Sequence, residues 1–66
     1  MIGKNIKILR RRKRLTQDKL ARLADIPFTT LNKIEAGINR RPRIDTVAKI
    51  AQALGVKIDE LFNGKS

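Results

Sequence analysis

The sequence predicts an all-α fold, a compact bundle of five short helices in a single domain over residues 1–66. Apolar residues recur at intervals of three and four along nearly the whole chain, which is the helical period, and no stretch sustains the alternation typical of a strand. The nine Ile and seven Leu residues are enough for one small helical core. Gly and Pro stand between the apolar segments, where helices end or begin.

The first helix is predicted from about Gly3 to Lys13. Three apolar residues fall on one of its faces, namely Ile2, Ile6 and Leu9. Ile8 falls off that face, so we expect it to be exposed. The cations at positions 10–14 suit the negative end of the helix dipole, so part of this basic run has a purely structural explanation.

The second helix is predicted from Gln17 to about Ala24, with Thr16 as its N-cap. Its inward face is expected to consist of Leu20, Ala21 and Ala24, whose small members allow another helix to come close. A turn follows at residues 25–27. Asp25 tolerates the left-handed conformation better than most residues, and Pro27 suits the first turn of a new helix but cannot continue the previous one.

The third helix is predicted from about Pro27 or Phe28 to Ala36, with Gly37 just beyond its end. Leu31 and Ile34 are expected to point inward. The opposite face is short and polar, and it carries Thr29, Asn32, Lys33 and Ala36 with Phe28 on the flank.

A loop with three arginines follows at residues 37–43. The fourth helix is predicted from about Asp45 to Leu54, capped by Asp45 or Thr46 and closed by Gly55. A short fifth helix is predicted from about Ile58 to Asn63, ending at Gly64.

The charge is strongly one-sided. The formal net charge is +10, and residues 1–43 hold 13 basic and 3 acidic groups, whereas residues 44–66 hold 3 of each. Charge concentrated in this way is typical of a surface that binds phosphates. The alternative is a basic helix surface that is merely solvated.

Several classes of protein are disfavoured by what the chain lacks. Without Cys or His there is no thiolate metal site and no recognisable nucleophile–base set, so we expect no metal, no cofactor and no enzymatic activity. No apolar run approaches the ~20 residues of a membrane span, and the N-terminus has no secretory h-region, so we expect a cytoplasmic protein. A membrane-surface binder would need a wide apolar face, and an RNA binder would need a stacking platform that two Phe do not supply.

The second and third predicted helices have the pattern of a helix-turn-helix, with small residues in the first and a polar outer face on the second. Four motifs at matching spacing carry a resemblance to a known family: Leu15-Thr-Gln17-x-x-Leu20-Ala21, Leu31-x-x-Ile34-Glu35-x-Gly37, Arg41-Pro42-Arg43-Ile44 and Ile50-Ala51-x-Ala53-Leu54-Gly55-Val56. With these motifs the chain resembles the Cro and phage-repressor type helix-turn-helix over roughly residues 2–64. The resemblance implies a transcriptional regulator that binds specific double-stranded DNA sequences, expected to be a repressor; the alternative is an antitoxin that also binds a toxin.

The resemblance also implies roles for particular residues. The base-reading face of the recognition helix matches Phe28, Thr29, Asn32 and Lys33. Contacts to the DNA backbone or minor groove match Arg10, Gln17, Arg40, Arg41 and Arg43, with Gln17 on a phosphate and Arg43 in a narrow minor groove. Arg10 and Glu35 match a buried ion pair of some phage repressors.

Phe28 departs from the family pattern. Phage repressors often carry Gln at this position, which reads a base and also bonds the Gln of the preceding helix. Phe28 can make neither bond. It can pack on a thymine methyl group, or it can pack against the helix pair near Pro27.

We also expect a two-fold dimer on half-sites about one helical turn apart. So short a chain gives only a small interface, so we expect this dimer to form mainly on DNA. We expect its interface in the neutral C-terminal third, near Ile44, Val56 and Ile58. The short chain leaves no room for a sizeable ligand-sensing domain, so no small-molecule effector is expected.

Overall fold

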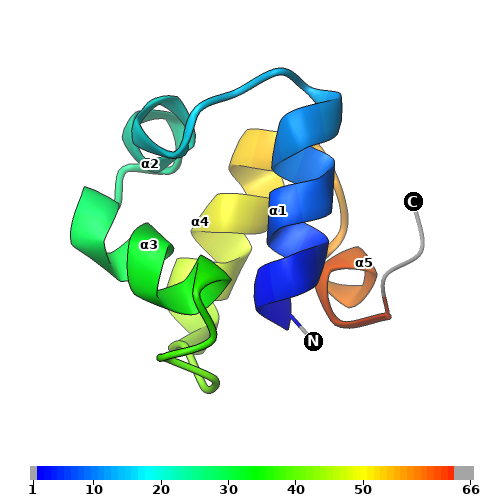
Figure 1. Cartoon of the computed structure of the whole chain (residues 1–66). Coiled ribbons are helices and arrows are strands. Elements are labelled where there is room, and N and C mark those ends of the chain that lie inside the picture. Colours follow the sequence, from blue (N-terminus) through cyan, green and yellow to red (C-terminus); the bar gives the residue numbers. More distant parts are fainter. Residues whose placement is uncertain (1, 64–66) are drawn as a thin grey trace.

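The computed structural model describes residues 2–63, which form five α-helices and no strand (Figure 1). The helices are α1 (Ile2–Arg12), α2 (Gln17–Ala24), α3 (Phe28–Glu35), α4 (Ile44–Leu54) and α5 (Ile58–Asn63). The predicted all-α architecture of five helices is therefore confirmed.

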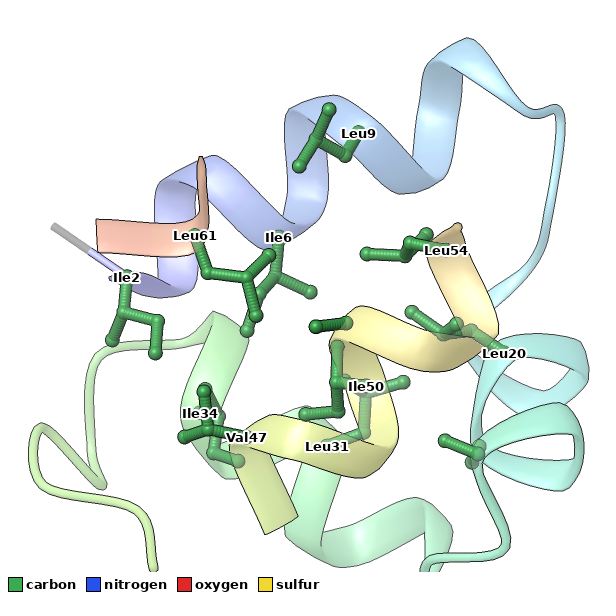
Figure 2. Close-up of a cluster of buried hydrophobic side chains, with 13 residues drawn as sticks. Ile2, Ile6, Leu9, Leu20, Leu31, Ile34, Val47, Ile50, Leu54 and Leu61 are labelled. Carbon is green, nitrogen blue, oxygen red and sulfur yellow. The ribbon is translucent and has the colours of Figure 1, made fainter. Parts of the chain in front are cut away.

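One hydrophobic core joins all five helices, and Figure 2 shows its side chains converging from every one of them. The largest fully buried side chains are Ile6, Leu20, Leu31, Ile34, Val47, Ile50, Leu54 and Leu61. Each inward face predicted from the helical period lies in this core, and Ile8 is exposed as expected. Leu31 and Ile34 hold α3 against this core. Truncating one of these side chains to Ala is expected to lower the free energy of unfolding by about 2–5 kcal/mol.

Small residues allow the helices to approach closely. A Cβ atom on Gly3 would overlap the carbonyl oxygen of Ile34, so α1 rests directly on the backbone near the end of α3. Ala21 and Ala24 are buried on the side of α2 that packs against α3 and α4. The helices α2 and α3 are thus packed closely against α1 and α4.

The helix ends follow the predicted capping residues. The Thr16 hydroxyl accepts a hydrogen bond from the Lys19 backbone N–H at 3.1 Å, which makes it the N-cap of α2. Asp25 ends α2 in the left-handed conformation, with φ 58° and ψ 47°. Gly55 closes α4 with φ 70°, where a side chain would be strained.

The predicted start of α4 is wrong by one residue. The helix begins at Ile44 because the Arg43 carbonyl accepts the Val47 N–H at 3.0 Å, which makes Arg43 the N-cap. Its side chain gives no cap, since a guanidinium carries only donors. Asp45 lies inside the first turn, where its Oδ1 accepts from the Thr46 N–H at 3.0 Å, so it is not the N-cap. The helix α1 also begins and ends one residue earlier than predicted. Gly64, the predicted end of α5, lies outside the described residues.

Candidate nucleic-acid interface

The helices α2 and α3 form the predicted helix-turn-helix, joined by residues 25–27. The turn is closed by the Ile26 N–H, which donates to the Ala21 carbonyl at 3.0 Å. Pro27 precedes α3 in an extended conformation, with φ −62° and ψ 143°, so the chain changes direction there. Leu20 and Leu31 are both fully buried, and they pin the two helices to the same core.

The outer face of α3 is presented to solvent. Leu31 and Ile34 are fully buried, and because helical positions opposite them point outward, the remaining face is open. The structure brings four predicted base-reading residues together on it, all exposed: Phe28, Thr29, Asn32 and Lys33. Lys33 forms no ion pair among the described residues, so its ammonium group is available to a ligand.

Phe28 is a surface residue. Its side chain lies outside the core cluster, and the residue is 46% exposed at the first position of α3. The ring is therefore not part of the core, and whether it packs on a thymine methyl group or against the helix pair near Pro27 stays a prediction. An apolar ring stands at the start of an otherwise polar face.

Gln17 is the first residue of α2 and is held from two sides. Its Nε2 donates to Glu35 Oε1 at 3.1 Å, and its Oε1 accepts from Asn32 Nδ2 at 3.1 Å. Asn32 thus makes the contact to the Gln of the preceding helix that Phe28 cannot make. Gln17 also stands at a helix N-terminus, where unpaired backbone N–H groups favour an anion.

Arg10 and Glu35 form a buried, bidentate ion pair between α1 and α3. Arg10 Nε donates to Glu35 Oε2 at 2.8 Å and Arg10 Nη2 donates to Oε1 at 3.0 Å. The side chains are only 10% and 2% exposed, and Arg10 Nη1 also donates to the Leu15 carbonyl at 2.7 Å. The expectation that Arg10 contacts the DNA backbone is corrected here, because its guanidinium is buried and occupied.

The loop after α3 carries the other predicted phosphate-binding cations. Arg40, Arg41 and Arg43 are all exposed. Arg40 Nε donates a long hydrogen bond to the Gly37 carbonyl, 3.4 Å, and the Asn39 side chain shapes the loop by accepting the Arg41 N–H at 3.1 Å. Arg43 pairs with Asp45 at 3.4 Å, but both side chains are more than half exposed, so this pair holds the arginine weakly.

The three residues predicted for a dimer surface do not share one patch within the chain. Ile44 is 67% exposed at the start of α4, whereas Val56 and Ile58 follow the other end of that helix. With eleven residues, α4 separates them by about 15 Å. Val56 and Ile58 are also partly buried against the core.

The bonds that Gln17 makes to Asn32 and Glu35 were missed by reasoning from the sequence. They join residues 15 and 18 positions apart, so no helical spacing indicates them. The resemblance was the available signal. In that family the Gln at the start of the second helix bonds a Gln at the position of Phe28, so in this chain Gln17 needs a different partner.

No helix within residues 2–63 has the length and apolar character required to cross a membrane.

Comparisons with known proteins agree with this geometry. A sequence model of the family described as helix-turn-helix matches residues 6–61. The transcriptional regulator SlrR of Bacillus subtilis is 32% identical over 66 residues, which is all of this chain but only 43% of SlrR. The chain therefore spans less than half the length of that relative.

Two solved structures have the same fold. The biofilm master regulator SinR, determined in complex with DNA, superimposes with a TM-score of 0.92 at 30% identity and covers 96% of this chain and 100% of its own. The restriction-modification controller protein C.AhdI of Aeromonas hydrophila superimposes with a TM-score of 0.87 at 30% identity, covering 92% of this chain and 91% of its own.

Proposed function

The chain belongs to the helix-turn-helix family, and we propose that it binds specific sequences of double-stranded DNA as a transcriptional regulator, acting as a repressor. The proposal is supported by its similarity to SlrR, a transcriptional regulator, and to SinR, which was solved bound to DNA.

The observation that carries the proposal is the two-sided character of α3. One side is fully buried through Leu31 and Ile34, and the other presents an unobstructed set of polar and apolar side chains. The eight residues of α3 make a rod about 12 Å long, and the major groove is about 12 Å wide. In the proposed complex α3 lies in that groove, and Lys33 donates to guanine O6 or N7.

Contacts to the DNA backbone would position α3. Gln17 and the free N–H groups at the start of α2 are suited to one phosphate. Arg40 and Arg41 extend from the loop that follows α3 and would bind further phosphates, which adds affinity without sequence information. Arg43 would enter the narrow minor groove of an A·T-rich segment.

We further propose that two copies bind a palindromic operator. Ile44 and Val56 lie at opposite ends of α4, so a two-fold axis that crosses the middle of α4 would place Ile44 of one copy against Val56 and Ile58 of the other. The exposed apolar area is small, so the dimer would form mainly on DNA. The same proposal puts the protein in the cytoplasm and needs no catalytic step, metal or cofactor.

Selection of bound sequences from random duplex DNA tests the function directly. We expect enrichment of one pair of inverted half-sites whose centres lie about one helical turn apart. A single-stranded RNA of the enriched sequence should fail to compete for the protein. Enrichment of no sequence, with equal binding to every duplex, would contradict a sequence-specific regulator.

A further inference from the structure

Four side chains form a hydrogen-bonded chain from the core to the outer face of α3. Arg10 is bound by both oxygens of Glu35, at 2.8 and 3.0 Å. Gln17 Nε2 donates to Glu35 Oε1, and Asn32 Nδ2 donates to Gln17 Oε1, each at 3.1 Å. This series of hydrogen bonds runs from the Glu35 carboxylate, which is 2% exposed, to the exposed amide of Asn32.

The buried Glu35 carboxylate determines which group donates and which accepts in each of these hydrogen bonds. The Glu35 carboxylate, paired with Arg10, can only accept hydrogen bonds. Gln17 must therefore face it with its NH₂ group, which leaves the Gln17 carbonyl oxygen toward Asn32. That oxygen also only accepts, so Asn32 must face it with its own NH₂ group.

The direction decides what Asn32 presents to a ligand. One N–H of its amide is used by Gln17, so one N–H and the carbonyl oxygen remain on the exposed side. Within residues 2–63 the Asn32 side chain makes no other hydrogen bond. A donor beside an acceptor is the complement of the major-groove edge of adenine, which offers N7 as acceptor and N6 as donor.

Guanine would meet the same amide badly. Its major-groove edge offers two acceptors, N7 and O6, so the Asn32 carbonyl oxygen would face O6 with no proton between them. An amide turned the other way would place its N–H opposite position 6 of the purine, where it meets the O6 acceptor of guanine but the N6 donor of adenine, so the preference for adenine would be lost. The orientation of this one amide therefore separates the two purines.

We propose that Glu35 and Gln17 are positioning residues that fix the orientation of the Asn32 amide and so make Asn32 select adenine over guanine. The inference rests on the proposed function, since it needs α3 in the major groove. It assigns a part in base preference to Glu35, whose side chain is too buried to touch DNA.

The test measures a ratio of affinities on matched operators. The base pair read by Asn32 is the position of the selected operator at which Asn32→Ala loses its preference. Wild-type protein is expected to bind the duplex with adenine there about 5- to 150-fold more tightly than the duplex with guanine. In Gln17→Leu the Asn32 amide can turn, so this ratio should fall severalfold toward one.

A phosphate contact alone would give a different result. If Gln17 only bound a phosphate, Gln17→Leu would weaken both duplexes equally and leave the ratio unchanged, which would overturn the inference. Lys19→Leu is the matched control, because Lys19 is an exposed cation in the same turn of α2 and has no bond to Asn32. It should lower both affinities and preserve the ratio.

A second variant tests the buried end of the chain. In Glu35→Gln the side chain can accept or donate, so the direction is lost and the adenine-to-guanine ratio should fall in protein that circular dichroism shows to be folded. An unchanged ratio in this variant would also overturn the inference. If Asn32→Ala changes no base preference, the inference fails while sequence-specific binding stands, and if the wild type selects no sequence, the proposed function fails with it.

Discussion

Gln17 and Glu35 are joined by a hydrogen bond of 3.1 Å, although 18 residues separate them in the chain. The bond ties the first residue of α2 to the last residue of α3, while Arg10 ties the same carboxylate to α1. One buried carboxylate thus fixes three helices relative to each other. The exposed face of α3 is held by a rigid support, as a groove-reading surface requires.

The Arg10–Glu35 pair should be the most sensitive polar contact for stability. Glu35→Leu leaves the Arg10 charge buried without a partner, so we expect the free energy of unfolding, measured in urea, to fall by about 3–5 kcal/mol. The double variant Arg10→Met, Glu35→Leu should recover most of this loss, because no buried charge remains.

The Asp18–Arg22 pair is the matched control for that experiment. Both side chains are exposed, so Asp18→Ala should change the free energy of unfolding by less than about 1 kcal/mol. A loss in Glu35→Leu no larger than in Asp18→Ala would show that the pair is not the buried tie described above.

Gly3→Ala should destabilise the domain by about 1–3 kcal/mol. The added methyl group would overlap the backbone oxygen of Ile34, and backbone yields less easily than the end of a side chain. Lys4→Ala is the control, since Lys4 is the next residue of α1 and is exposed. Thermal unfolding followed by circular dichroism compares the two, and equal melting temperatures would refute the close approach of α1 to α3.

Binding to the selected operator should weaken steeply with salt. The logarithm of the affinity is expected to fall linearly with the logarithm of salt concentration, with a slope of roughly −0.9 for each phosphate neutralised. Arg41→Ala should make this slope shallower by about one and weaken every sequence alike. A flat titration with wild-type protein would contradict a phosphate-binding surface.

Lys33→Ala should behave differently from Arg41→Ala. Lys33 lies on the exposed face of α3, so its loss is expected to cost about 1–3 kcal/mol and to relax the preference at one base pair. Repeating the sequence selection with each variant separates the two effects. Uniform weakening in both variants would remove Lys33 from the set of base-reading residues.

The proposed dimer contact at Ile44 is testable on DNA. Sedimentation on the palindromic operator should show two copies per duplex, and Ile44→Ser should weaken binding of the second copy by about tenfold or more. Ile38→Ser is the matched control, because Ile38 is equally large and exposed but is not placed in the interface. Binding of a single copy to the full palindrome would contradict the dimer.

Much of this architecture follows from local sequence. Helical period places Leu31 and Ile34 inside and Asn32 and Lys33 outside, and turn chemistry accounts for Asp25. The start of α4 was harder to predict because two plausible caps, Asp45 and Thr46, compete with an Arg43 carbonyl that begins the helix without any side-chain cap.

The contacts between distant residues are less accessible to such reasoning. The resemblance supplied the Arg10–Glu35 partnership, and burial of the guanidinium excludes the alternative in which Arg10 is exposed and contacts the DNA backbone. The bond from Asn32 to Gln17 depends on how α2 and α3 cross, which no periodicity in the sequence encodes. The base-reading and phosphate-binding assignments stay predictions.

Methylation interference tests most directly whether α3 enters the major groove of its operator. Guanine N7 lies in the major groove and adenine N3 in the minor groove, so methyl groups at these atoms report on the two grooves separately. We expect methylation of guanine N7 within each half-site to block binding, and that block to disappear at one guanine in Lys33→Ala. Interference confined to adenine N3, or none at all, would show that α3 does not lie in the major groove.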